Sequence, residues 1–354
     1  MAKVFGAFYT REELLNRVGD IAQISGISIE ELTEGRAKGV QVANIWTGSG
    51  LEFSINLSRG MSIGAFRYKG IPFGWISATG DVAPWYYEPG GEGLDRSYAG
   101  GLMHLAGLRQ VGAPCQDENE NLGLHGRICN IPAEKVYGDG YWDGDEYRII
   151  LKGMLREVRA LGENVVLRRT ISTALGGNEI TIEDQVLNAG QKTTPHMILY
   201  HTNFGFPLID KDSRLMIASK EVTDAFTGDS VPNEVYSRFT EPKEDAGQQI
   251  YFHNTREQNG WSGFILANKN LKVGLQVDYL KKNLPLLINW VNLEAGHNVV
   301  EVGPANCKCF GRAAERESGT LQYLEPGEVR DYTMKFTVLD GLAAIDKAEI
   351  ALNK

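Results

Sequence analysis

The chain has 354 residues, of which 42% are hydrophobic and 23% are charged, a composition typical of a globular protein and not of a disordered one. A formal net charge of -9 leaves no basic surface for a phosphate backbone, so nucleic acid is not expected as a partner. No apolar run approaches the length of a membrane span, and the N-terminus lacks the apolar core of a signal peptide. We therefore expect a cytoplasmic protein that does not enter a membrane.

Helix is scarce in the sequence and is expected only near its two ends. Residues 10–26 begin with a capping box, because Thr10 can cap a helix and Glu13 can bond back to it, and an apolar stripe follows. A second candidate helix closes the chain. We therefore expect an N-terminal helical extension over residues 1–38 and a C-terminal helix over residues 340–354.

Between these ends, apolar and polar residues alternate with a period of two, as in antiparallel strands. Residues 147–190 predict successive strands with turns at 162–164 and 176–178. Further strands are expected at 41–48, 51–57, 196–204, 262–268, 271–279, 285–292 and 329–339. Because no amphipathic helices separate these strands, the sequence predicts stacked antiparallel sheets and one domain over residues 1–354.

Two long irregular stretches, residues 79–101 and 105–127, interrupt the strand pattern. Loops of this length in a compact β protein are usually functional. They carry aromatic and directional polar side chains, among them Trp85, Tyr86, Tyr87, Arg96 and His125. Aromatic faces cover the C–H patches of a sugar and charged donors bind its hydroxyls, so the loops favour a small carbohydrate as the ligand.

Two of the six histidines stand out by their neighbours. His125 lies in the run GLHGR, where the glycines are expected to let a ligand hydroxyl approach the backbone. His201 ends an apolar strand and is followed by Asn203; the alternative is a half-buried histidine bonded to the backbone. His104 lies near a bend and is expected either to be structural or to reach a pocket.

Two charged residues have unusual surroundings. Glu301 lies inside an apolar strand, which is costly unless the carboxylate is paired or functional, or unless it faces solvent at a strand edge. Arg59 stands among small residues and is either a surface charge or a fork for hydroxyl or anionic groups. The sequence contains no signature of a nucleotide-binding loop, a serine hydrolase or a zinc hydrolase.

Four segments, residues 58–77, 101–128, 196–210 and 304–312, resemble the bacterial aldose 1-epimerase-like proteins that are filed as a domain of unknown function within the galactose mutarotase superfamily. The resemblance implies a β-supersandwich of large antiparallel sheets with a few short helices and an open sugar cleft. It also implies an enzyme that opens the sugar ring, lets the C1–C2 bond rotate and closes the ring as the other anomer. Such a reaction requires one acid and one base and neither a metal nor an organic cofactor.

The resemblance assigns roles to four residues. His201 matches the histidine that protonates the ring oxygen. His125 matches a second histidine, which bonds ring-side hydroxyls and helps to hold charge. Arg59 and Arg127 match arginines that orient the sugar.

The expected base differs in position from that of the relatives, which usually read Gly-x-Glu-Pro-Ala-Asn. In this chain the glutamate and the glycine have exchanged places, as Glu301 and Gly303. A shift of two residues along a strand keeps the same face and moves the carboxylate by about 6.6 Å. Ser62 also differs, because relatives often carry an aspartate there.

The leading hypothesis is an aldose 1-epimerase-like isomerase. Its expected catalytic residues are His201, His125 and Glu301, and its expected substrate-binding residues are Arg59, Arg127, Asn203, His104 and Arg96. One alternative is a carbohydrate-binding or sensing protein without turnover. Another is a different sugar isomerisation on the same fold, with an acid from elsewhere, such as Glu88 or Glu294.

Overall fold

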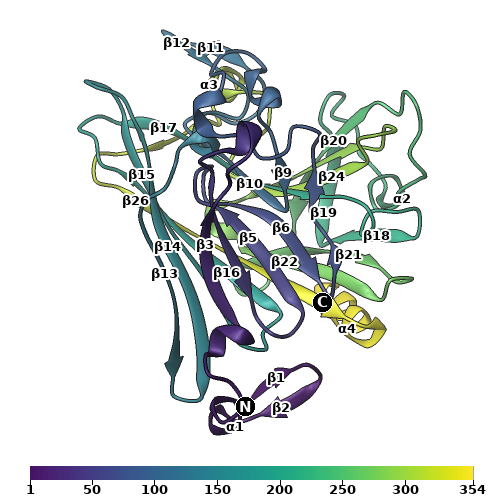
Figure 1. Cartoon of the computed structure of the whole chain (residues 1–354). Coiled ribbons are helices and arrows are strands. Elements are labelled where there is room, and N and C mark those ends of the chain that lie inside the picture. The colour runs from purple at the N-terminus through teal and green to yellow at the C-terminus, as the bar shows by residue number, and fades with distance from the viewer. Residues whose placement is uncertain (354) are drawn as a thin grey trace.

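The structure, a computed structural model, describes residues 1–353, and two large antiparallel sheets make up most of it (Figure 1). The larger has twelve strands, ten of which follow one another in the order β19 (Ser219–Asp224), β20 (Gln248–Thr255), β23 (Leu286–Asn292), β24 (Val299–Ala305), β17 (Thr194–Phe204), β10 (Met103–Leu108), β6 (Ser62–Tyr68), β5 (Leu51–Asn56), β4 (Gln41–Trp46) and β3 (Gly26–Glu31). The short strands β7 (Ile71–Pro72) and β25 (Gln322–Leu324) pair with β6 and β17.

The second sheet has eight strands. Their order is β13 (Glu134–Asp143), β14 (Glu146–Val158), β15 (Asn164–Ala174), β16 (Glu179–Asn188), β26 (Val329–Asp340), β22 (Val273–Leu280), β21 (Trp261–Asn268) and β18 (Ser213–Ile217). The strands predicted within residues 147–190 are β14, β15 and β16, each joined to the next by a short turn. The prediction of a mostly β protein with large antiparallel sheets and few short helices is therefore confirmed.

The remaining elements are short. Three two-stranded ribbons pair β1 (Ala2–Val4) with β2 (Ala7–Tyr9), β8 (Trp75–Ile76) with β9 (Gly100–Gly101), and β11 (Cys115–Asp117) with β12 (Glu120–Leu122). The α-helices are α1 (Arg11–Leu15), α2 (Asn233–Tyr236), α3 (Arg312–Glu317) and α4 (Leu342–Leu352). Within residues 1–353, no helix has both the length and the apolar character needed to cross a membrane.

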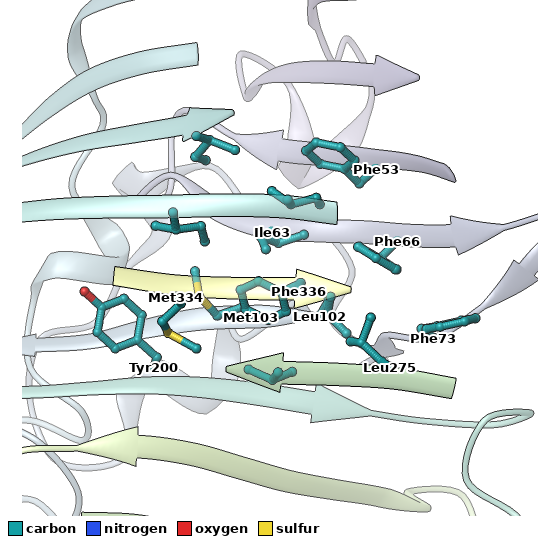
Figure 2. Close-up of a cluster of buried hydrophobic side chains, with 14 of the residues drawn as sticks. Phe53, Ile63, Phe66, Phe73, Leu102, Met103, Tyr200, Leu275, Met334 and Phe336 are labelled. Carbon is teal, nitrogen blue, oxygen red and sulfur yellow. The ribbon is translucent and has the colours of Figure 1, made fainter. Parts of the chain in front are cut away.

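The main hydrophobic core lies between the two large sheets. Figure 2 shows side chains of both sheets in contact there: Phe53, Ile63, Phe66, Met103 and Tyr200 from the larger sheet, and Leu275, Met334 and Phe336 from the smaller one. Strand residues of one parity fill this core, so the alternate residues of the larger sheet face away from it. Four of the predicted site residues lie on that outward face: His104, His201, Asn203 and Glu301.

The N-terminal segment differs from the expected helical extension. The capping box between Thr10 and Glu13 forms, but the α-helix ends at Leu15 instead of continuing to residue 26. Asp20 starts a separate 3-10 turn by accepting a hydrogen bond from Ala22, which interrupts the helical ladder. Residues 26–31 then form strand β3 of the larger sheet, so most of this segment is not helical. The C-terminal helix is confirmed as α4, and residue 354 of the expected range lies outside the described residues.

Candidate functional site

The outward face of the larger sheet carries a line of polar side chains on adjacent strands, called the polar row below. Strands β10 and β17 place His104 directly opposite His201, and strands β5 and β6 place Asn56 directly opposite Ser62. The register between β6 and β10 sets Ser62 beside His104. Residues opposite each other in antiparallel strands share one face, with Cβ atoms about 5 Å apart. The polar row therefore runs from Asn56 to His201 across four strands.

Glu301 extends the polar row to a fifth strand. Strands β17 and β24 pair with Asn203 opposite Glu301, which leaves Gly303 opposite His201. A β carbon on Gly303 would lie only 2.1 Å from Oε1 of Glu301, so the glutamate side chain bends over the glycine. The carboxyl group thus reaches the strand position opposite His201. The displacement of about 6.6 Å expected from the sequence is largely removed by the length of the side chain.

Burial controls the protonation of Glu301, which is only 1% exposed. Its Oε2 accepts a hydrogen bond of 3.3 Å from the backbone N–H of Trp290, whereas Oε1 has no hydrogen-bond partner among the described residues. Burial raises the pKa of the carboxyl group well above its usual value. Burial therefore shifts Glu301 toward the protonated, neutral form.

A buried network fixes the orientation of His201. The amide nitrogen of Asn203 donates to the carbonyls of Gly101 and His201, so its oxygen is the atom that accepts the 2.9 Å hydrogen bond from the Tyr98 hydroxyl. With that hydrogen used, the Tyr98 oxygen can only accept at the 3.3 Å contact with Nδ1 of His201. His201 therefore carries its proton on Nδ1 and presents a lone pair on Nε2.

The same surroundings keep His201 neutral. Burial, together with the nearby His125, lowers the pKa of His201 to about 3. Because both amide atoms of Asn203 are engaged within the protein, we treat Asn203 as a residue that positions Tyr98 and His201 and not as a direct sugar contact. His201 is therefore neutral with an acceptor at Nε2, whereas burial shifts Glu301 toward its protonated form.

His125 completes the reactive part of the site from a loop. Its ring stands perpendicular to that of His201, with the centroids 5.2 Å apart. Nδ1 of His125 accepts a 3.2 Å hydrogen bond from the Gly112 N–H, so Nε2 carries the proton and is a donor. Burial lowers the pKa of His125 to about 4, and the ring is therefore neutral at pH 7.

The glycines next to His125 allow close packing of protein backbone and do not open space for a ligand. A β carbon on Gly126 would lie 2.5 Å from the carbonyl oxygen of Gly107 and 2.6 Å from that of Gln110. The backbone of His125 is bonded to Gly112 and Gly107 in the same segment. The expectation that these glycines leave room for a sugar hydroxyl is therefore wrong, because protein backbone already fills the space.

Buried ion pairs hold the loop that leads to His125. Arg312 at the start of α3 contacts Asp117 and Glu120 at 2.5 Å each, and Arg109 contacts Glu120 at 2.9 Å. Although burial opposes it, the two arginines lower the pKa of Glu120 to about 2. Figure 1 shows α3 close to β11 and β12, where these pairs form. The ion pairs of α3 with Asp117 and Glu120 therefore hold this loop in place.

His104 and Arg59 line the same cavity, on the side of His201 that faces away from Glu301 along the polar row. The edge of the His104 ring packs on Tyr98 with centroids 4.7 Å apart, and burial lowers the pKa of His104 well below its usual value. Arg59 is buried and donates to the carbonyl oxygens of Cys129 at 3.1 Å and Val82 at 2.8 Å. Both residues line one cavity of about 160 Å³.

The other two predicted arginines are not part of the buried network. Arg127 is exposed, and Arg96 is exposed and pairs with Glu88 at 3.6 Å. Their roles in sugar binding stay predictions. Among residues 1–353, no three His, Cys, Asp or Glu side chains come together in a way that could hold a metal ion.

Two further residues of the site were not predicted from the sequence. Tyr98 connects His104, His201 and Asn203, although it lies 103 residues from His201 in the chain. Trp290 lies opposite Glu301, and its ring centroid is 6.4 Å from that of His201. The long loop of residues 79–101 was predicted to be functional, but no sequence pattern distinguishes Tyr98 from its other aromatic residues.

Comparison with known proteins supports the fold assignment. Residues 37–338 match a family described as Domain of unknown function (DUF4432), and no curated protein matches the chain. A Klebsiella pneumoniae protein provisionally described as an aldose 1-epimerase has a TM-score of 0.86 at 21% identity, covering 97% of this chain and 90% of that one.

Two structures with lower TM-scores and lower sequence identity share the same fold. A galactose mutarotase-like protein from Clostridium acetobutylicum has a TM-score of 0.61 at 14% identity, and a galactose 1-epimerase from Lactobacillus acidophilus has one of 0.56 at 12% identity. Each comparison covers 90% of this chain and 99% of the other. At such identities the similarity shows the fold alone, which is galactose mutarotase-like.

Proposed function

Because the chain belongs to the DUF4432 family and has a galactose mutarotase-like fold, we propose that it is an aldose 1-epimerase-like isomerase that interconverts the anomers of a sugar. One observation carries the proposal. The carboxyl group of Glu301 lies over Gly303, opposite His201, so an acid and a base face the same point on the sheet.

The chemistry needs only the proton that this pair shares. A base removes the proton of the C1 hydroxyl while an acid protonates the ring oxygen, and the bond between C1 and the ring oxygen breaks. After rotation about C1–C2, both protons return as the ring closes. In this scheme Glu301, whose protonated form burial favours, is the acid, and Nε2 of His201 is the base.

The resemblance implies the opposite assignment, in which His201 protonates the ring oxygen and Glu301 acts as the base. The two assignments contain the same number of protons, because moving one proton from Glu301 to His201 converts one into the other. The burial of both groups favours the proton on Glu301, since that arrangement leaves neither group charged.

The neighbouring side chains supply binding and orientation. Nε2–H of His125 is a donor on a ring that packs against the His201 ring, and it suits a sugar hydroxyl or the oxygen that gains charge as the ring opens. Trp290 adds an aromatic surface beside His201. Arg59 and His104 lie farther along the polar row and suit the other end of the sugar.

A sugar-binding protein without turnover is the second candidate. The observation in its favour is the 1% exposure of Glu301, because an acid that a sugar cannot reach transfers no proton. Two measurements on one panel of aldoses separate the two functions: binding by calorimetry and anomer exchange by NMR. Saturable binding with accelerated exchange supports the isomerase, whereas saturable binding with exchange at the buffer rate supports the binding protein.

Replacing Tyr98 by phenylalanine is expected to slow anomer exchange about 10–100-fold with little change in KM, because His201 and Asn203 lose the hydroxyl that orients them. The matched control is Tyr332→Phe, which removes another buried hydroxyl bonded to a histidine, His196 at 2.7 Å. The control should keep the wild-type exchange rate. Equal losses in both variants would mean that Tyr98 acts only through general stability.

A further inference from the structure

The cavity beside His104 has features of a binding site that lies next to the reacting pair. It has a volume of about 160 Å³ and is lined by Asn56, Arg59, Ser62, Asp81 and His104, together with small residues such as Gly101. An engineered cavity of about 150 Å³ holds a benzene molecule. The space therefore suits about six non-hydrogen atoms.

Three polar atoms in the cavity wall have no hydrogen-bond partner among the described residues: Oδ1 of Asn56, Oγ of Ser62 and Nε2 of His104. Each of these residues is more than nine-tenths buried. Leaving such buried groups unpaired destabilises the protein, and a ligand that bonds to them would remove that cost. All three belong to the polar row, so they face the same side as His201.

The cavity is flanked by one positive charge, the Arg59 guanidinium, and one negative charge, the Asp81 carboxylate. Burial lowers the pKa of the Arg59 guanidinium, and the negative charge of Asp81 partly offsets this effect. Asp81 also accepts a 2.9 Å hydrogen bond from the amide nitrogen of Asn56, which leaves the amide oxygen of Asn56 as the free acceptor. One cation and one anion therefore flank a mixture of donors and acceptors.

Hydroxyl groups fit this mixture better than an anionic group. A hydroxyl can donate to Asn56 and accept from Arg59, whose five N–H donors are only partly engaged by the carbonyls of Cys129 and Val82. A phosphate, sulfonate or carboxylate would meet the Asn56 oxygen and the Asp81 carboxylate as repelling neighbours. The wall thus selects a neutral ligand.

The cavity and the pair formed by His201 and Glu301 lie on neighbouring strands of the larger sheet. His104 stands directly opposite His201, at a Cβ separation of about 5 Å, and Ser62 and Asn56 follow on the next two strands. A sugar whose anomeric carbon lies between His201 and Glu301, and which runs along the row past the Tyr98 ring that packs on His104, reaches this cavity with its far end.

We propose that this cavity is the specificity pocket, and that it takes the neutral, hydroxyl-bearing end of the sugar farthest from the anomeric carbon. The proposal rests on the proposed function for the position of the anomeric carbon. It assigns new binding roles to Asn56 and Ser62 and makes the substrate a neutral aldose and not a sugar acid or sugar phosphate.

The test measures binding by calorimetry for glucose, galactose, mannose and xylose and for the 6-phosphates and uronic acids of the three hexoses. At least one neutral sugar should bind at least tenfold more tightly than its anionic derivatives. Asn56→Leu, which removes the free acceptor and fills the space, should weaken that binding about tenfold or more. Asp81→Asn should narrow the difference between neutral and anionic sugars, because it removes the repelling charge.

Several results would overturn the proposal: an anionic derivative that binds as tightly as its neutral parent, unchanged binding in Asn56→Leu, or no binding by any sugar of the panel. If Asn56→Leu does not fold, as judged by circular dichroism, Ser62→Ala takes its place, with weaker neutral-sugar binding expected and unchanged binding as the contrary result. Neutral-sugar binding that follows these predictions without anomer exchange would contradict the proposed function and leave the pocket assignment standing.

Discussion

Glu301→Gln is expected to slow anomer exchange by about 10²–10⁴-fold, the usual contribution of an acid or base that transfers a proton in the transition state. The glutamine side chain has nearly the same shape and can still accept the Trp290 N–H, so the fold should remain. His201→Ala should cause a loss of similar size, with sugar binding weakened but measurable. NMR magnetisation transfer between the anomeric protons measures both rates.

The double variant sharpens this prediction. Because His201 and Glu301 act as one proton-transferring unit, Glu301→Gln combined with His201→Ala should be about as slow as either single variant. Losses that multiply would show that the two residues act independently. Glu294→Gln is the matched control, since Glu294 is a carboxylate of the same type outside the polar row, and it should keep the wild-type rate. A loss in that control with normal activity of Glu301→Gln would favour the other-isomerase alternative.

Acidification from pH 7 to pH 5 is expected to lower the free energy of unfolding by on the order of 5 kcal/mol. Burial is the main reason that the pKa values of five histidines are lowered, to about 3 for His201 and His253, to about 4 for His125 and His196, and well below the usual value for His104. Below about pH 6.5 the unfolded chain binds protons at these residues and the folded protein does not, so stability falls as the pH falls.

The size of this effect follows from the same pKa values. For each histidine, the free energy of unfolding falls by about 1.4 kcal/mol for every pH unit below 6.5. Five histidines therefore lower it by on the order of 10 kcal/mol by pH 5. Typical domains have about 5–15 kcal/mol of stability. Glu301 and Glu157 act in the opposite direction, because burial raises their pKa values and their protonation favours the folded state as the pH falls. At the same rate of about 1.4 kcal/mol per pH unit these two groups offset up to about 5 kcal/mol between pH 7 and pH 5, so the net loss is on the order of 5 kcal/mol.

Urea unfolding at pH 7, 6 and 5 measures the effect. We expect the free energy of unfolding to change little between pH 7 and pH 6.5 and to fall steeply below pH 6. A free energy that stays constant down to pH 5 would mean that the histidines titrate normally in the folded protein, and that the burial inferred for these five side chains is wrong.

The sequence predicted the sheets well because their signals are local. The alternation over residues 147–190 and the turns within it reappear as β14, β15 and β16. The helix of residues 10–26 failed for a local reason too, since Asp20 caps a new turn that the apolar stripe did not reveal. Strand β13, which pairs with β14 over most of its length, was missed because residues 134–143 carry few apolar side chains.

The site was predicted only as far as single residues allow. Histidines 125 and 201 and Glu301 were identified from their neighbours in sequence. That Glu301 bends over Gly303 depends on the pairing of β17 with β24, which no single sequence displays. The contact of Tyr98 with His201 likewise depends on how a long loop folds back over the sheet. Register and loop path are long-range properties, so the polar row could be recognised only in the structure.

The most direct test of the central claim is the rate of anomer exchange in the wild-type protein, measured by NMR between pH 6 and pH 8. The account predicts exchange that is faster than in buffer, proportional to protein concentration and free of any ionisation with a midpoint near 6.5, because His201 stays neutral throughout this range. Exchange at the buffer rate for every sugar would contradict the proposed activity. Accelerated exchange that falls tenfold per pH unit above 6.5 would contradict the shared-proton arrangement, since it would require an ordinary protonated histidine as the acid.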